Sequence, residues 1–227
     1  MEKHVWLYYS TARRFCYEMA LGVAYLHGRQ PRMLIHRDIK PSNYMLTGSL
    51  RVKLGDFGVA RIVSNDTMDS SRHGDATLDQ TSNCGTVRFM APEVHAAPGA
   101  DKTRLYSPKA DIFSLGLVFY FVFEHKLPSL HGAASPADHV RKLLEGHRPE
   151  FLDTPKAVQA IINRCWATEP TARPSAGELI ELLARLPKAR GFPCCGLRRR
   201  SRYPCVSLTF TDETAPKPST QDSWFRS

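Results

Sequence analysis

The sequence predicts a mainly helical α+β fold, in which a bundle of helices carries one short β-hairpin. Apolar residues indicate five helical segments, and four of these lie after Pro92. Two short apolar stretches on either side of Gly48-Ser49 have the pattern of a hairpin. The length of 227 residues and the apolar fraction of 42% are ordinary for one sizeable domain or two small ones.

The first element is an amphipathic helix, which we expect over Thr11–His27 with its end near Gly28. A short apolar stretch then leads into a loop crowded with polar groups, and "YMLT" and "RVKLGD" follow as the two strands of the hairpin. From Val59 to Phe89 the chain is polar and predicts a long loop, which in a compact domain is usually functional or disordered. The stripe of the first helix consists of Ala12, Phe15, Met19, Ala20, Val23 and Leu26.

Four helices are expected after Pro92. The first, Lys109–Phe123, contains the most apolar run of the chain, whose 12 residues from Ile112 are too few to span a bilayer and indicate a buried core helix. In the second, over residues 136–146, Asp138 marks the polar face, and the expected apolar face is formed by Val140, Leu143 and Leu144.

The last two helices are expected over residues 155–167 and 175–186. The former has an apolar stripe of Val158, Ile161, Ile162 and Cys165. The latter begins with Ser175 as a candidate N-cap, and Glu178 three residues later completes the pattern of a capping box. We therefore expect one folded domain over residues 1–186.

The composition of residues 187–227 predicts a basic, disordered tail that contains Ser and Pro. The whole chain has a formal net charge of +9, which favours acidic partners. Adjacent cysteines, Cys194 and Cys195, among basic residues leave open attachment to a membrane surface by acylation, beside the simpler interpretation of a soluble tail. Nucleic-acid binding is disfavoured because Phe192 and Tyr203 form no stacking platform.

The six cysteines are scattered, and none forms a C-x-x-C pair or lies near a cluster of histidines. This spacing disfavours a zinc site. Scattered cysteines without a signal peptide fit a reducing compartment, so we expect a cytoplasmic protein.

Three short motifs occur in order: "HRDIKPSN" from His36 to Asn43, "DFG" from Asp56 to Gly58, and "APE" from Ala91 to Glu93. A given tripeptide is expected by chance in about 3% of chains of this length, and all three motifs together in roughly one chain in a million. With these motifs the chain resembles the C-terminal lobe of a eukaryotic-type protein kinase over most of its length. The resemblance implies a C-lobe fold with the hairpin at the cleft, and residues 1–186 then form part of a catalytic domain.

The resemblance also implies the chemistry of the site. Phosphoryl transfer needs charge neutralised on the γ-phosphate of ATP and an acceptor hydroxyl held in line. Asp38 is the implied base for that hydroxyl, and Lys40 the cation that steadies the phosphate. The side-chain oxygens of Asn43 and Asp56 are the implied ligands of Mg²⁺, and Met45 lies where the family places an apolar side chain beneath adenine.

A lysine two positions after the catalytic aspartate, as in Lys40, resembles serine/threonine kinases. Thr86 in "CGTVRFMAPE" matches the threonine that contacts such an Asp and Lys, which favours the same class. The segment "CWATEPTARPS" resembles the tyrosine-kinase-like group of serine/threonine kinases. The implied function is transfer of the ATP γ-phosphate to Ser or Thr of protein substrates in signalling.

Other matching residues have structural or regulatory roles in the family. Glu93 and Arg173 match a buried ion pair, and Asp111 matches a residue that caps the backbone of the catalytic loop. Arg37 matches an arginine that pairs with a phosphate on the activation loop, for which Ser82 is the first candidate and Thr81 the alternative, after action by an upstream kinase. The remaining structural positions implied by the motifs are His36, Phe57 and Gly58.

The chain begins only about ten residues before its first helix, and no G-x-G-x-x-G or V-A-I-K-like segment occurs in it. We therefore expect the N-terminal lobe, which carries the Gly-rich loop and the strand lysine in the family, to be absent. The alternative to a catalytic chain is a non-catalytic kinase-like fragment or pseudokinase that acts as a binding scaffold.

Overall fold

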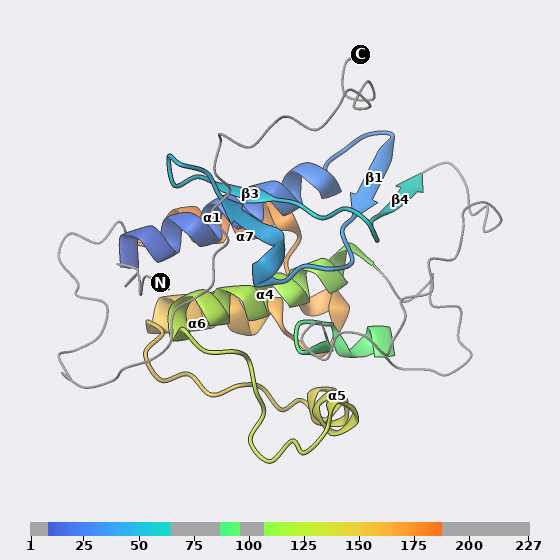
Figure 1. The fold of residues 1–227 in the computed structure, drawn as a ribbon, viewed down its shortest axis with the longest axis vertical. Coiled ribbons are helices and arrows are strands. Elements are labelled where there is room, and N and C mark those ends of the chain that lie inside the picture. Colours follow the sequence, from blue (N-terminus) through green and yellow to red (C-terminus); the bar gives the residue numbers. More distant parts are fainter. Residues whose placement is uncertain (1–8, 65–86, 96–106, 188–227) are drawn as a thin grey trace.

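The computed structural model describes residues 9–64, 87–95 and 107–187. This part of the chain is mostly helical with two small antiparallel sheets, which agrees with the predicted α+β class (Figure 1). The main helices are α1 (Tyr9–His27), α4 (Pro108–Glu124), α5 (Pro136–Leu144), α6 (Lys156–Cys165) and α7 (Ala176–Arg185), and the short 3-10 turns are η1 (Pro41–Asn43), η2 (Pro92–His95) and η3 (Pro170–Ala172).

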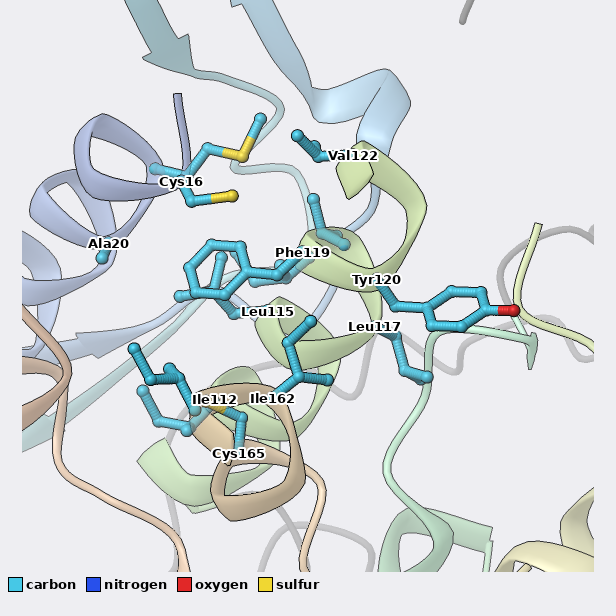
Figure 2. Packing of buried hydrophobic residues seen from close by; sticks show 14 of the residues in the cluster. Cys16, Ala20, Ile112, Leu115, Leu117, Phe119, Tyr120, Val122, Ile162 and Cys165 are labelled. Atoms are coloured by element: carbon cyan, nitrogen blue, oxygen red, sulfur yellow. The ribbon is translucent and has the colours of Figure 1, made fainter. Parts of the chain in front are cut away.

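Helix α4 forms the centre of the core, and α1 and α6 pack against it. Figure 2 shows its side chains, among them Ile112, Leu115 and Phe119, between Cys16 and Ala20 on one side and Ile162 and Cys165 on the other. Almost every residue of α4 is buried, as the sequence predicted for this apolar run. A helix buried on all sides is apolar all round because no face of it meets water.

The ends of the helices follow the local sequence. Ser107 and Ser135 cap α4 and α5, each with its side chain accepting a backbone hydrogen bond and with proline in the first turn. Ser175 and Glu178 form the predicted capping box of α7. The apolar stripes predicted for α1 and α6 are buried.

Two cysteines of the described residues, Cys16 of α1 and Cys165 of α6, are free thiols in this core. Burial raises the pKa of Cys165 to about 12 and raises the pKa of Cys16 well above its usual value. Both thiols therefore stay protonated at neutral pH and act as small apolar groups.

The predicted hairpin is formed by β2 (Tyr44–Leu46) and β3 (Val52–Leu54), with Tyr44 opposite Leu54. The turn at its end spans Thr47–Arg51, and the residue with positive φ is Leu50, at 56°, rather than Gly48. Arg14 donates to the carbonyl oxygen of Leu50 over 2.8 Å, so α1 supports this turn from outside the hairpin.

A second sheet was not predicted. Strands β1 (Arg32–Ile35) and β4 (Arg61–Ser64) pair antiparallel, with Ile35 opposite Arg61. The sequence analysis assigned Arg61–Ser64 to the long polar loop, and that assignment is wrong for these four residues. The two strands are short, and their nearest paired residues, Ile35 and Arg61, lie 26 positions apart in the sequence, so only the folded chain reveals the pairing.

The buried face of α5 also differs from the prediction. Its buried residues are His139 and Leu143, while Leu144 is 46% exposed. Of the three residues predicted to form the apolar face, Leu143 is buried, Val140 is half-buried and Leu144 is exposed. The face is decided by the docking of α5 on η2, which periodicity within a nine-residue helix does not specify.

We predict that Gly116→Ala destabilises the protein by about 1–3 kcal/mol because it overpacks the contact between α4 and α6. A Cβ at Gly116 would lie 2.6 Å from Cβ of Cys165, so one of the two helices must move. Urea unfolding measures the loss.

The matched control is Gly177→Ala in α7, where a Cβ meets no atom within 4 Å. This change removes only the flexibility of glycine and is expected to stabilise the helix by about 0.5 kcal/mol. Equal effects of the two substitutions would contradict the steric explanation.

Candidate active site

The polar loop that follows β1 is held by one carboxylate from the buried helix α4. Oδ2 of Asp111 accepts the backbone N–H of His36 over 2.8 Å, and Oδ1 accepts that of Arg37 over 2.9 Å. Arg37 has a φ of 71°, in the left-handed region that residues other than glycine rarely adopt. Two hydrogen bonds to a buried carboxylate offset the strain of such a backbone, so Asp111 stabilises the unusual turn of the loop.

His27 is a third partner of Asp111 that the sequence analysis missed. Its Nε2 lies 2.8 Å from Oδ2 of Asp111, and its side chain is 9% exposed. His27 is the last residue of α1 and lies 84 positions before Asp111. No motif spacing predicts a contact between residues so far apart. The local sequence shows only that a histidine ends the first predicted helix.

The loop containing Asp56 is joined to the polar loop through Gly55. Gly55 donates its backbone N–H to the carbonyl oxygen of Asn43 over 2.9 Å, and its own carbonyl oxygen lies 3.0 Å from Nε2 of His36. The rings of His36 and Phe57 are 5.2 Å apart. A Cβ at Gly55 would approach Cε of Met45 to 2.7 Å, so a larger residue here would displace the end of the methionine side chain.

Three of the predicted site residues contact one another directly. Oδ2 of Asp38 lies 2.7 Å from Nζ of Lys40, and the amide nitrogen of Asn43 donates to the same Oδ2 over 3.1 Å and to the backbone oxygen of Asp38 over 2.7 Å. The other carboxylate oxygen of Asp38, Oδ1, is buried and has no hydrogen-bond partner. A buried acceptor without a donor costs about 1–3 kcal/mol, which marks Oδ1 as an atom that a bound group would satisfy.

Asp56 is exposed and has a φ of 58°. Its Oδ1 accepts the backbone N–H of Gly58 at 3.4 Å, and within the described part of the chain no hydrogen bond or ion pair joins its carboxylate to Asp38 or Asn43. The two hydrogen bonds of Gly55 nevertheless place the backbone of Asp56 one residue from contact with Asn43. Met45 lies in β2 opposite Lys53 and is half-buried beside Gly55.

The oxygen atoms of Asn43 and Asp56 fit a hard cation better than a soft one. The amide nitrogen of Asn43 is directed at Asp38, so its amide oxygen points away from that carboxylate. Across residues 9–64, 87–95 and 107–187 there is no group of three or more His, Cys, Asp or Glu that could hold a metal by itself. Mg²⁺ is usually bound by one or two protein carboxylates or amides together with phosphate oxygens and water, so this small set of ligands fits it.

Glu93 and Arg173, which are 80 positions apart, form a two-pronged ion pair with N–O distances of 2.6 Å and 2.9 Å. The side chain of Arg173 is fully buried. Arg173 also donates to the carbonyl oxygens of Ala167, Lys109 and Thr168. The guanidinium is therefore paired and hydrogen-bonded on all sides, as a buried charge requires.

Phe113 of α4 lies beneath two guanidinium groups. The Arg173 carbon Cζ is 4.8 Å from its ring centroid and that of Arg148 is 5.5 Å away. The pKa of Arg148 is lowered to about 10, chiefly by burial and also by the neighbouring charge of Arg173, while Glu93 acts in the opposite direction. An aromatic ring between two cations offsets part of their repulsion.

Thr81, Ser82 and Thr86 lie outside the described residues, as does the basic tail. Among the helices of the described residues, none combines the length and the apolar character needed to cross a membrane.

Comparison with known proteins adds an independent observation to this geometry. Residues 1–182 match the protein kinase domain. The chain belongs to the protein kinase family. It is 33% identical over 223 residues to human mitogen-activated protein kinase kinase kinase 7, a match that covers 96% of this chain and 32% of the relative. It is also 33% identical over 187 residues to the serine/threonine-protein kinase VIK of Arabidopsis thaliana, covering 80% of this chain and 38% of that protein.

A third relative of the kinase family is the probable serine/threonine-protein kinase drkD of Dictyostelium discoideum, which is 34% identical over 168 residues. The chain spans about a third of the length of the mitogen-activated protein kinase kinase kinase 7 proteins that it matches. Protein kinases use ATP and Mg²⁺, the two cofactors that the motifs implied, and they act on proteins.

We predict that Glu93→Gln destabilises the protein by about 3–5 kcal/mol, because it leaves the fully buried Arg173 charge without its anion. Urea unfolding followed by tryptophan fluorescence measures the change. Trp166 lies in the same region, since Arg148 donates to its backbone oxygen, and reports on the surroundings of the pair.

The control is Glu181→Gln in the exposed pair between Arg185 and Glu181, whose side chains are 76% and 69% exposed. A pair this exposed contributes about 0.5 kcal/mol or less. A loss at Glu93 as small as that at Glu181 would show that the guanidinium of Arg173 does not depend on its carboxylate.

Proposed function

We propose that this chain is the C-terminal lobe portion of a serine/threonine protein kinase of the tyrosine-kinase-like group. In this proposal residues 1–186 belong to the catalytic domain and residues 187–227 form a separate basic tail. Its reaction transfers the γ-phosphoryl group of ATP to a Ser or Thr hydroxyl of a protein in a signalling pathway of the cytoplasm. The unpartnered Oδ1 of Asp38 carries the proposal, because it is a buried acceptor without a hydrogen-bond partner, between residues of the kinase motif.

Asp38 is the proposed base. Lys40 and Asn43 both contact Oδ2, which holds the carboxylate in one orientation and leaves Oδ1 as the atom for the acceptor hydroxyl. Oδ1 accepts the hydroxyl proton as the Ser or Thr oxygen bonds to phosphorus, and the bond from phosphorus to the β-phosphate oxygen breaks. The products are ADP, the phosphorylated protein and a proton held on Asp38.

Asn43 and Asp56 are the proposed ligands of Mg²⁺, and Met45 is the proposed apolar contact of adenine. When bound, Mg²⁺ neutralises negative charge on the phosphates. Lys40 adds a positive charge near the γ-phosphate, and its contact with Asp38 holds it beside the base. Thr86 is proposed to contact Asp38 and Lys40, and His36 and Phe57 support the backbone on which Asp56 lies.

We predict that Asp38→Asn lowers phosphate transfer by a factor of about 10²–10⁴, the usual contribution of a positioned base. The assay uses the full chain with Mg·ATP and dephosphorylated casein, and radioactive phosphate on Ser and Thr is counted. The exposed Asp153→Asn is the control and is expected to leave transfer unchanged.

Calorimetric titration with Mg·ATP accompanies this assay, because it separates binding from chemistry. Binding by both the native chain and Asp38→Asn, with transfer by the native chain alone, supports the proposal. No heat at millimolar Mg·ATP and no transfer would instead favour the alternative function, a non-catalytic kinase-like scaffold.

Regulation by phosphorylation belongs to the same proposal. A phosphate on Ser82, or alternatively on Thr81, placed there by an upstream kinase, would pair with Arg37, whose left-handed backbone is held by Asp111. We predict that the double substitution Thr81→Ala, Ser82→Ala abolishes activation by an upstream kinase, measured as the rise in transfer after treatment. Full activation of the double variant would refute this site of regulation.

A further inference from the structure

Helix α5 packs on the rest of the described structure through a face that contains a buried histidine. The element that it packs against is η2, and the two lie together in Figure 1, with α5 seen end-on apart from the central helices. Its buried residues are Leu143 and His139, one turn apart on the same face. A histidine thus occupies a position that an apolar residue would fill in an ordinary amphipathic helix.

The imidazole of His139 is buried without a partner for one of its nitrogens. The residue is 8% exposed, and its Nε2 has no hydrogen-bond partner. In the neutral ring this nitrogen costs the free energy of an unsatisfied polar group. In the protonated ring it would carry an N–H with a share of a full positive charge, at a much greater cost.

The groups that face His139 would increase that cost. Arg88, before η2, and His95, at its end, both act on the imidazole as positive or potentially positive groups. The acidic residue of η2, Glu93, is occupied by its ion pair with Arg173. On α5 itself Arg141 and Lys142 are basic, and Asp138 is paired with Arg141 over 2.5 Å.

We propose that His139 is a proton-sensitive latch: neutral, it lets α5 dock on η2, and protonated, it weakens that docking. The docking interface adjoins the segment that ends the long loop after Asp56, since η2 begins directly after Ala91. Acidification is therefore expected to act on the docking of α5 and on η2.

The direction of the pH dependence follows from the pKa of His139. Burial lowers this pKa below 6.5, and the charges of Arg88 and His95 lower it further. Because the docked state binds the proton less well than the undocked state, docking is fully stable at pH values above the usual histidine pKa. Its stability decreases as the pH falls below about 6.5 and continues to decrease down to the lowered pKa of the docked state.

The test is hydrogen exchange of the full chain at pH 7.5 and pH 5.5, corrected for the intrinsic rate and followed by mass spectrometry of peptides. We expect peptides of α5 and η2 to exchange several-fold faster at pH 5.5, while α1 and α7 change little. His139→Leu is expected to remove this response and to keep α5 protected at both pH values. His139→Lys is expected to leave α5 unprotected at both.

Two controls make the result specific. His147→Gln changes the exposed histidine that follows α5, whose side chain is 63% exposed, and is expected to keep the response of the native chain. His125, at the end of α4, also has a lowered pKa through burial, so its neighbourhood around Glu124 and residues 152–154 is monitored separately.

Three outcomes would overturn the proposal. One is a response that persists in His139→Leu. Another is faster exchange confined to the region of His125. The third is an equal loss of protection in α1, α5 and α7, which would indicate acid destabilisation of the whole domain.

Discussion

The candidate site depends on the carboxylate of Asp111, which holds two successive backbone N–H groups of a strained loop. This carboxylate lies in the first turn of α4, the most buried helix of the described structure, and its side chain is 2% exposed. The core fixes the position of Asp111, and Asp111 in turn fixes the position of the loop, because a short charged hydrogen bond tolerates little displacement. His27 extends the same contact to the end of α1, so two helices and the loop meet at one side chain.

Hydrogen bonds to the backbone also join this loop to the loop that contains Asp56. His36 faces Gly55, and Gly55 also contacts the carbonyl oxygen of Asn43. Asp38 and Asp56, the residues with proposed chemical roles, therefore adjoin residues that these backbone hydrogen bonds hold in place. Oδ1 of Asp38 is buried and unsatisfied beside these contacts, which fits the proposed role of Asp38 as a preorganised base.

Three buried ionisable side chains, Arg173, Glu124 and His139, differ in how far their surroundings compensate a charge. Arg173 has a carboxylate, three carbonyl oxygens and an aromatic ring around it, so its charge is compensated. Glu124, at the end of α4, accepts hydrogen bonds from Leu152, Asp153 and Thr154 and so holds the loop before α6. His139 has no such compensation, and its burial is stable only while the ring is neutral. Among α1, α4, α5, α6 and α7, the helix that carries it, α5, has the fewest buried residues.

The sequence by itself determined the helices, the capping box of α7, the β2–β3 hairpin and the motifs, because these are local: periodicity, capping pairs and short residue patterns act over a few positions. It also named Asp38, Asn43 and Asp56 through their motifs. Only the tertiary structure decided the pairing of β1 with β4, the buried face of α5 and the partners of Asp111, including His27. These depend on residues tens of positions apart, whose meeting is set by how the helices pack and not by any pattern that one segment displays.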